Sequence, residues 1–419
     1  MLANEQVLTT ELLNQLSDQY GNAFYLLESK TFESNYKELS AAFRYYYPKF
    51  NIAYSYKTNY TPKLAKIVNR AGGYAEVVSD MEMEAALRCG VDPSHIIWNG
   101  PVKNEEKVQE LLLSGGTVNI DSVCELENLR KISESYPDSM LRVGIRCNYE
   151  VGDGILSRFG IDTDGMEFDM ALRFIKSRRN VKLASLQAHF ARRLPKFWTA
   201  RTEGMLRIYD RVVEDYGLKP ERLDIGGGIY GKMPESLRLQ LGVENAGFHD
   251  YASRSAKLFA EHFKDEADPP YLFIEPGSAV AGDCMRFVCR IETIKTVKGK
   301  TIATVTGSQK NIGMSGINPP IEVIPGSHSP RVSSEYADVD IAGFTCIESD
   351  FLYRGYRGML DIGDYVVIRN CGSYSLVMKP PFILPNFVMI DLNGDSASGS
   401  IEVIKRAECF DDLFHTFHF

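Results

Sequence analysis

The sequence predicts an α/β protein made of a parallel (β/α)8 TIM barrel and a second, mostly antiparallel β domain. Between residues 50 and 275, eight β-prone runs alternate with amphipathic helical segments, which is typical of a barrel with parallel strands. After Gly277 the β-prone runs follow one another with few helical stretches, as in an antiparallel sheet. With 419 residues, the chain is long enough for both domains.

The expected barrel strands recur at regular spacing, and Gly-rich turns separate several helices from the next strand. The strands are Asn51–Tyr56, Ala75–Ser79, His95–Asn99, Thr117–Asp121, Met140–Cys147, Val181–His189, Arg222–Ile225 and Tyr271–Glu275. The helical segments between them include Pro62–Arg70, Met81–Cys89, Glu105–Leu113, Cys124–Glu134 and Trp198–Tyr216.

The second domain is expected to combine both ends of the chain. Its β-prone runs are Phe287–Lys298, Thr301–Thr306, Val339–Ala342, Tyr365–Arg369 and Phe387–Asp391. The strand-like segment Phe24–Glu28 precedes the barrel and is expected to join the same sheet. We therefore expect a barrel over residues 30–276 and a β domain built from residues 1–29 and 277–419.

The composition excludes several classes of protein. A net charge of −8 and the lack of a basic run with interleaved aromatics argue against nucleic acid as the main partner. The first residues lack the features of a signal peptide, and no apolar stretch reaches the ~20 residues that cross a bilayer, so no membrane partner is expected. The eight cysteines and seven histidines show no metal-ligand spacing, which predicts a reduced, cytoplasmic protein without a metal site.

The carboxyl ends of the expected barrel strands are where such barrels place their chemistry. Lys57, in Tyr54-Ser-Tyr-Lys-Thr-Asn59, follows the first strand, and a partly buried lysine amine is suited to Schiff-base chemistry. A solvated surface charge is the alternative interpretation of this residue alone. Arg146 and Glu275 end two further strands, and an ion pair between them is one interpretation.

Three of the strand ends, that of Glu275 among them, carry groups that suit a phosphorylated, aromatic cofactor. Gly226, Gly227 and Gly228 form a glycine triplet whose successive N–H groups can bind a phosphate, although a tight turn explains the triplet equally well. His189 can stack on an aromatic ring or be an ordinary core histidine. Glu275, followed by Pro276 and Gly277, can hold a proton on a heterocyclic nitrogen.

Two clusters in the β domain add candidate groups. The segment Gly343–Asp350 contains Cys346 beside Glu348 and Asp350, a possible proton donor with two substrate-contacting carboxylates. Tyr374 follows a Gly-Ser turn and is a candidate phosphate ligand. A buried thiol and a packed tyrosine are the alternatives.

Together, these residues resemble the fold-type III pyridoxal-phosphate decarboxylases, the family of diaminopimelate and ornithine decarboxylases with an alanine-racemase-like fold. The resemblance implies that Lys57 forms the Schiff base, His189 stacks on the ring, Glu275 binds the ring nitrogen, and Arg146 supports Glu275. Gly226–Gly228 and Tyr374 would bind the phosphate. Cys346 resembles a cysteine contributed across a homodimer interface, which would reprotonate Cα. Glu76, Glu82 and Arg158 match further charged positions of the family.

The chain departs from the family at positions that affect anion and substrate binding. In the family, an arginine usually follows the Glu-Pro-Gly motif, whereas this chain has Ser278 at that position. The turn after the stacking histidine also differs and reads His189-Phe-Ala-Arg-Arg193. We hypothesise that Arg192 or Arg193 replaces the missing charge as a phosphate or carboxylate partner. The arginine and tyrosine of diaminopimelate enzymes have no match in Gly307–Gly316, and the aspartate that follows the cysteine in ornithine enzymes is Ile347.

These departures favour a specialised decarboxylase whose small-molecule substrate is an amino acid or an amino acid carried on a larger conjugate, as in siderophore or surface-polysaccharide synthesis. An amino-acid racemase is the first alternative, but racemases of this fold place an arginine at the ring nitrogen and need a catalytic tyrosine opposite the lysine. A non-catalytic homologue that binds the cofactor is the second alternative. It predicts loss of the lysine, histidine or cysteine, and Lys57, His189 and Cys346 are all present.

Overall fold

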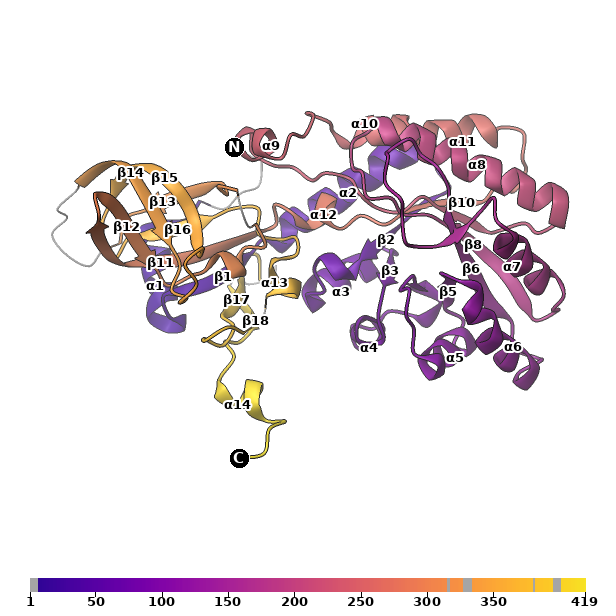
Figure 1. Cartoon of the computed structure of the whole chain (residues 1–419), viewed down its shortest axis with the longest axis horizontal. Coiled ribbons are helices and arrows are strands. Elements are labelled where there is room, and N and C mark those ends of the chain that lie inside the picture. Colours follow the sequence, from indigo (N-terminus) through magenta and orange to yellow (C-terminus); the bar gives the residue numbers. More distant parts are fainter. Residues whose placement is uncertain (1–6, 315–316, 327–333, 380, 395–400) are drawn as a thin grey trace. The chain divides into compact units, whose positions relative to one another are not determined.

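The computed structural model describes residues 7–314, 317–326, 334–379, 381–394 and 401–419, and the chain divides into two compact units (Figure 1). The barrel unit consists of Asn35–Tyr230 and Glu244–Val280. The β unit combines the chain up to Ser34, Gly231–Val243 and the chain from Ala281 onward. The segment Gly231–Val243, which falls within the range 30–276 expected for the barrel, thus groups with the β unit.

The barrel unit contains a closed ring of eight parallel strands. In ring order they are β2 (Phe50–Ser55), β3 (Tyr74–Val77), β4 (Ile96–Trp98), β5 (Thr117–Ile120), β6 (Leu141–Asn148), β8 (Val181–Gln187), β9 (Arg222–Asp224) and β10 (Tyr271–Ile274), which pairs with β2. Each expected strand is present, and its ends lie within two residues of the predicted ones. The predicted barrel is therefore confirmed.

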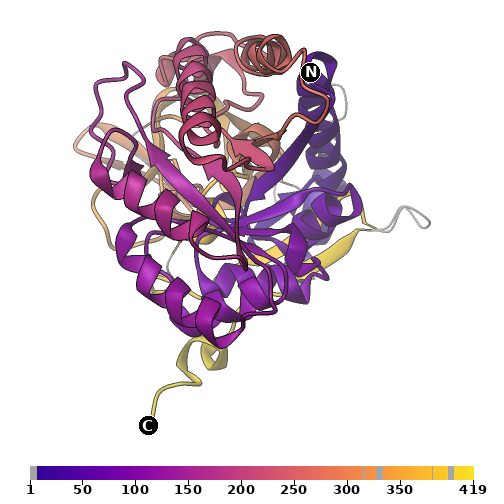
Figure 2. The same cartoon turned by 90° about the vertical axis from the view of Figure 1, so that its right-hand side faces the viewer.

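Helices surround the strands, as the end-on view in Figure 2 shows. They are α2 (Ser29–Tyr46), α3 (Pro62–Arg70), α4 (Asp80–Arg88), α5 (Glu105–Leu113), α6 (Leu126–Ser135), α7 (Met166–Lys176), α8 (Lys196–Tyr216), α10 (Phe248–Ser253), α11 (Ala256–His262) and α12 (Ser278–Ala281). Short 3-10 turns lie at η1 (Tyr56–Thr58), η2 (Pro93–His95) and η3 (Val123–Glu125), and β7 (Ile161–Asp162) pairs in parallel with the end of β6.

Local sequence explains where these helices begin. Pro62 occupies the first turn of α3, where its missing N–H costs nothing. The Ser79 side chain caps α4 by accepting a hydrogen bond from Glu82 N, and Asn104 caps α5 in the same way through Lys107 N. One face of each helix is then apolar and buried, as Leu64, Ala65, Ile67 and Val68 are in α3.

The β unit is a mostly antiparallel sheet in the order β15-β14-β12-β11-β1-β17-β18, with β16 pairing with β11 and β13. Its strands are β1 (Ala23–Leu27), β11 (Met285–Val297), β12 (Lys300–Val305), β13 (Ile321–Ile324), β14 (Ser334–Ala342), β15 (Phe351–Leu360), β16 (Tyr365–Ile368), β17 (Val388–Asp391) and β18 (Glu402–Lys405). The remaining elements are α1 (Thr10–Tyr20), α9 (Glu235–Gln240), η4 (Gln309–Asn311), α13 (Ser375–Met378) and α14 (Phe410–Phe414).

Strand β1 confirms that the N-terminal segment joins this sheet, because it pairs antiparallel with β11 and parallel with β17. The sheet buries apolar residues such as Phe24, Leu26, Val288, Tyr365 and Ile390 in one core. Strands β13, β15 and β18 were not expected from the sequence.

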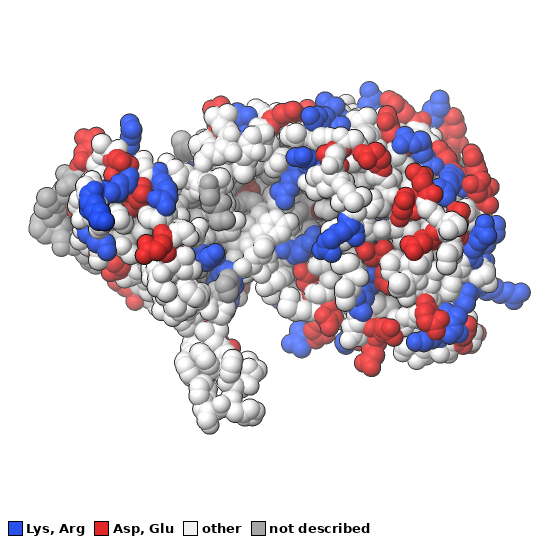
Figure 3. All heavy atoms as spheres, in the orientation of Figure 1, with Lys and Arg blue, Asp and Glu red and all other residues white. Residues whose placement is uncertain are grey.

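Acidic and basic side chains are interspersed over the barrel unit on the face drawn in Figure 3, without a large patch of one sign. Among the described residues, the structure contains no helix that is both long and apolar enough to span a bilayer.

Candidate active site

Lys57 lies in a rigid turn at the carboxyl end of β2. The strand is almost wholly buried, and η1 begins directly after it. The Tyr54 hydroxyl donates to the Asn59 carbonyl at 2.8 Å, which ties the strand to the end of the turn. Gly277 passes so close to this turn that a Cβ there would overlap the Thr58 side chain. The fold therefore presents Lys57 in one defined position.

The Lys57 amine is held by Glu76, which ends β3. Lys57 Nζ lies 2.5 Å from Glu76 Oε2, and the same oxygen accepts a hydrogen bond from Ser55 Oγ. Ser55 and Glu76 are paired across β2 and β3, so the sheet register places these groups side by side. The Lys57 side chain is 32% exposed, whereas the Glu76 side chain is fully buried. The lysine is therefore accessible while the carboxylate that holds its amine is not.

Glu275, at the end of β10, lies at the centre of a buried polar cluster. Its Oε1 accepts hydrogen bonds from Asn99 Nδ2 and from Gln187 Nε2, the latter at 3.0 Å. Its Oε2 lies 3.8 Å from His189 Nδ1. Asn99 also donates to Glu76 Oε1 at 3.2 Å, which connects this cluster to the Lys57 anchor. Four strand ends thus converge on two buried carboxylates.

Burial raises the pKa of three carboxyl groups in this region, Glu275, Asp224 and Glu82. The pKa of Glu275 lies well above its usual range, first because the group is buried and then because Asp224 and Glu76 are negative neighbours. Burial likewise raises the pKa of Asp224 to about 7. Burial raises the pKa of Glu82 to about 7 as well, although its carboxylate accepts a hydrogen bond from Val78 N at 2.8 Å.

The raised pKa of the buried Asp224 predicts how the stability of the folded chain depends on pH. An unfolded aspartate has a pKa near 4, so the folded chain binds this proton more tightly. The resulting stabilisation is complete below about pH 4 and is lost as the pH rises through about 7. Asp224→Asn should therefore raise the thermal midpoint of the cofactor-free protein by several degrees at pH 8 and by much less at pH 5. The exposed Asp265→Asn is the control, and an equal gain at both pH values would contradict this account.

In the glycine triplet Gly226–Gly228, two of the three backbone N–H groups already have hydrogen-bond partners within the protein. Gly226 and Gly228 have positive φ values of 71° and 92°, which glycine adopts without strain. Gly226 N donates to Asp224 Oδ1 at 2.8 Å and Gly227 N donates to His189 Nδ1 at 3.0 Å. The expectation that all three N–H groups bind a phosphate is therefore corrected: two of them serve the protein itself. Gly228 is the member of the triplet that suits an external anion.

The same hydrogen bond defines the state of His189. Because Nδ1 accepts from Gly227 N, the ring proton of a neutral imidazole lies on Nε2. The pKa of His189 is well below its usual value, chiefly because of burial and then because Lys57 is positive. The structure thus positions an uncharged imidazole between the glycine turn and Glu275.

Comparison with known proteins identifies the family to which these residues belong. The family model described as pyridoxal-dependent decarboxylase, pyridoxal binding domain, matches residues 31–282. The chain belongs to the pyridoxal-dependent decarboxylase family. It is 26% identical to the diaminopimelate decarboxylase of Methanothermobacter thermautotrophicus, over 95% of this chain and 92% of that protein. The predicted family is confirmed, and with it a pyridoxal-phosphate-dependent amino-acid decarboxylase.

Solved structures of the family share the fold. Diaminopimelate decarboxylase from Helicobacter pylori, complexed with L-lysine, superposes with a TM-score of 0.80 at 20% identity, covering 96% of this chain and 98% of that one. Arginine decarboxylase from Paramecium bursaria Chlorella virus gives a TM-score of 0.72 at 19% identity, covering 89% and 97%.

The barrel unit fits pyridoxal phosphate. The hydrogen bonds to Glu275 come from neutral amides, so a protonated ring nitrogen would supply the counter-charge that a buried carboxylate needs. Lys57 offers an amine beside this carboxylate cluster, and His189 offers a flat uncharged ring. Gly227 also allows close packing, because a Cβ there would overlap the Glu275 carbonyl.

Arg146 lies against Asp121 and Phe159. Its Nη1 lies 3.5 Å from Asp121 Oδ1, and its guanidinium lies 4.5 Å from the centre of the Phe159 ring. Asp121 Oδ1 also accepts from Gly160 N, which ties this pair to the loop after β6. The hydrogen bonds to Glu275 come from Asn99 and Gln187, and the positive charge of Arg146 acts on Glu275 through space by lowering its pKa. The exposed Arg158 lies 4.0 Å from the same Phe159 ring.

The two arginines after His189 differ in their surroundings. Arg192 is exposed, and its carbonyl accepts a hydrogen bond from the buried Arg201 at 3.2 Å. Arg193 is partly buried, its carbonyl accepts from Tyr251 Oη at 3.0 Å, and its Cγ would lie 3.6 Å from a Cβ on Gly228. Arg201 also donates to the Gly227 carbonyl at 2.7 Å. Of the two candidates, Arg193 is therefore the one whose side chain lies against the glycine turn, whereas Arg192 approaches Gly228 with its backbone carbonyl.

In the β unit, the Gly343–Asp350 loop separates its candidate residues. Cys346 and Glu348 are exposed. Asp350 is buried, and its carboxylate accepts hydrogen bonds from Ser308 Oγ, Gln309 N and Thr345 Oγ1 at 3.0, 2.9 and 2.6 Å. Asp350 thus organises the loop that carries the other two, and its role as a substrate contact stays a prediction.

Tyr374 adopts a backbone conformation that is unusual for a tyrosine. Its φ is +60°, in the left-handed region that favours glycine, and it immediately precedes α13. A strained backbone at a predicted ligand residue is consistent with a functional constraint.

Sequence reasoning missed Asn99, Gln187, Asp224 and Arg201. Asn99 and Gln187 lie at the ends of β4 and β8, so a systematic reading of the last inward-facing residue of every strand would have found them. Arg201 lies in mid-helix α8, where the sequence gives no sign that it reaches the Gly227 carbonyl.

Proposed function

We propose that this decarboxylase removes the α-carboxylate of an amino acid or amino-acid conjugate in a specialised biosynthetic pathway, of the siderophore or polysaccharide type. The observation that supports its reaction type best is the buried Glu275, which is held by Asn99 and Gln187 beside His189. An acid in this position favours a protonated ring nitrogen, whereas the arginine of racemases suppresses that state.

Each side chain then has a defined task. Pyridoxal phosphate, when bound, supplies the electron sink for the pair left by departing CO2. Lys57 would attach the cofactor, and Glu76 orients the amine by accepting its hydrogen bond at Oε2. Glu275 would keep the ring nitrogen charged, His189 would cover the ring with an uncharged face, and Gly228 and Arg193 would bind the phosphate, a task that the family resemblance also gives to Tyr374.

The substrate proposal rests on the missing distal contacts. Ile347 replaces the aspartate that binds a distal amine in ornithine enzymes, and Gly307–Met314 contains neither the arginine nor the tyrosine of diaminopimelate enzymes. Glu348, exposed next to Cys346, remains a candidate contact to the substrate.

We also propose a cytoplasmic location for this protein. All eight cysteines are free thiols, which supports the cytoplasm as the location.

Proton NMR in D2O tests the reaction and the substrate class together. The pyridoxal-phosphate-loaded protein is incubated with diaminopimelate, lysine, ornithine, arginine, glutamate and citrate-conjugated diamines. We expect loss of the carboxylate and one deuteron on the product carbon for a conjugated substrate. Exchange of the α-proton with the carboxylate retained would contradict decarboxylation and indicate a racemase. Efficient turnover of free diaminopimelate would contradict the specialised substrate.

The position of Arg193 predicts a difference between two neighbouring arginines. Arg193→Ala should weaken the affinity for pyridoxal phosphate by about 10- to 100-fold, because a charge-assisted contact to the phosphate is lost. Arg192→Ala, the matched control, should leave it within about twofold. The measurement is equilibrium titration of the cofactor-free protein with pyridoxal phosphate. Equal losses in both variants would contradict the assignment.

We further propose a homodimer in which Cys346 of one subunit donates a proton at the site of the other. Lys57→Ala and Cys346→Ala chains, each inactive alone, should then regain about a quarter of the wild-type activity when they are co-assembled in equal amounts. Half of the dimers would contain one intact site. If sedimentation shows that mixed dimers have formed but the activity does not recover, each site lies within a single chain.

A further inference from the structure

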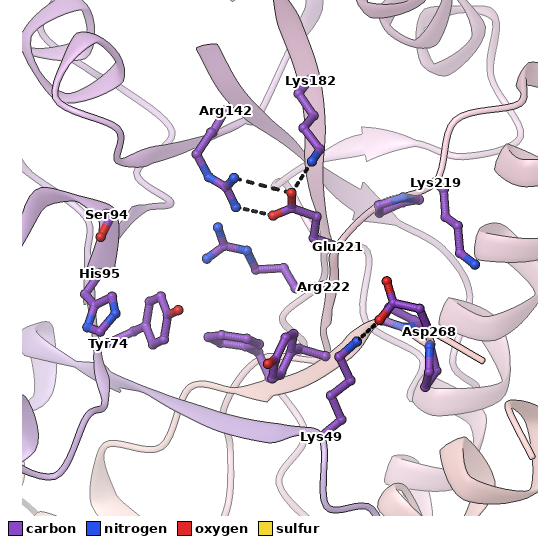
Figure 4. Close-up of a pocket in the computed structure, with 15 residues that line it drawn as sticks. Lys49, Tyr74, Ser94, His95, Arg142, Lys182, Lys219, Glu221, Arg222 and Asp268 are labelled. Carbon is purple, nitrogen blue, oxygen red and sulfur yellow. Dashed lines mark hydrogen bonds and ion pairs between the residues drawn. The ribbon is translucent and has the colours of Figure 1, made fainter. Parts of the chain in front are cut away.

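A second cavity lies at the amino ends of the barrel strands, the opposite end from Lys57 and Glu275. It has a volume of about 660 Å3 and lies wholly within the barrel unit. Its lining residues precede or begin the strands, among them Lys49, Tyr74, His95, Arg142, Lys182, Arg222 and Tyr271 (Figure 4). This basal cavity is large enough for a small organic ligand.

The basal cavity has an excess of positive charge. Five Lys and Arg side chains line it, against the two carboxylates of Glu221 and Asp268. Asp268 is paired with Lys49. Glu221 pairs with both Arg142 and Lys182, so one carboxylate faces two cations, with Arg222 as a third beside them (Figure 4). Hydrogen bonds from these cations lower the pKa of Glu221 despite the opposing effect of its burial.

Arg222 provides an independent sign of a missing ligand. Its side chain is buried, at 4% exposure, and points into the basal cavity between Arg142 and Tyr74 (Figure 4). Nη2 donates to Thr117 Oγ1 at 2.7 Å, but Nη1 has no hydrogen-bond partner among the described residues. Burial, and then the nearby Arg142, lower the pKa of Arg222 to about 10. A buried guanidinium of this kind is stabilised by an anion.

The remaining wall is apolar and aromatic. Tyr74 stacks on His95 with ring centres 4.3 Å apart, and Phe273, Tyr271 and a proline-rich segment complete it. We propose that the basal cavity binds a small phosphate-bearing molecule, with the phosphate against Arg222, Arg142 and Lys182 and the carbon skeleton against this wall. Planar guanidinium groups suit bidentate contact with phosphate oxygens. This site is independent of the proposed reaction.

Titration calorimetry with adenosine 5′-monophosphate tests the site. The full-length, pyridoxal-phosphate-loaded protein is used at low ionic strength, so that the catalytic phosphate site is filled and screening is weak. The nucleotide should bind, whereas adenosine, which lacks the phosphate, should not bind measurably. Nucleotide that does not bind, or adenosine that binds equally well, would overturn the proposal.

Two variants separate this site from general charge effects. Lys182→Gln should weaken nucleotide binding by about tenfold, and Glu221→Gln should strengthen it by about tenfold, because the competing carboxylate is removed. A gain of affinity cannot arise from misfolding. Lys257→Gln, which changes an exposed lysine on α11, should leave the affinity unchanged. Affinity that does not respond to Lys182→Gln and Glu221→Gln would overturn the proposal.

Discussion

Lys57→Ala is expected to abolish decarboxylation and the visible absorption of lysine-bound cofactor. The amine beside Glu76 is the attachment point, and removal of a covalent catalytic group costs about three orders of magnitude or more in rate. The measurement combines absorption spectra with the initial rate of CO2 release. The loss should appear in kcat.

Lys66→Ala is the matched control, since Lys66 is an exposed lysine on the neighbouring helix α3. It should retain wild-type spectra and rates. A Lys57→Ala protein that keeps the visible band and turns over would contradict the assignment of the attachment point.

Glu275→Gln should lower kcat by about 10²- to 10³-fold while cofactor binding remains. The amide oxygen can still accept from Asn99 and Gln187, so the polar cluster stays intact. The negative charge that keeps the ring nitrogen protonated is lost, and preorganised charges of this kind have effects of this size. Steady-state kinetics and cofactor titration on the same preparation separate the two quantities.

The Gln187→Met variant provides the comparison. It removes one neutral hydrogen bond to Glu275 but leaves the charge, so its kcat should fall much less than that of Glu275→Gln. If Glu275→Gln stays within about threefold of wild type, the ring-nitrogen role of Glu275 is wrong.

The barrel could be predicted because its local signals agree with the fold. Strand β2 is a continuous apolar run, and α3 begins with a proline and has an apolar face, so propensity and periodicity point the same way. The β unit was predicted less completely. Strand β15 alternates tyrosine, arginine and glycine in Phe351–Leu360, which weakens the signal of an apolar strand.

The sequence indicates candidate site residues where one residue type suggests the chemistry, as for Lys57, His189 and Glu275, whose roles stay predictions. The site was not predictable where hydrogen bonds distribute the roles. In the sequence, the Gly226 and Gly227 N–H groups look available to bind a phosphate. In the structure, they donate hydrogen bonds to Asp224 and His189. Arg146 pairs with Asp121, a partner that depends on the loop after β6. Such choices follow from three-dimensional geometry rather than from residue type.

Borohydride reduction of the cofactor-loaded protein, followed by peptide mass mapping, tests the central claim most directly. It fixes the cofactor on the lysine that holds it. The account predicts the added mass on the peptide that contains Lys57, with no other lysine labelled in proportion. Label on Lys379 instead, a buried lysine of the β unit whose pKa burial lowers to about 7, would contradict the proposed active site.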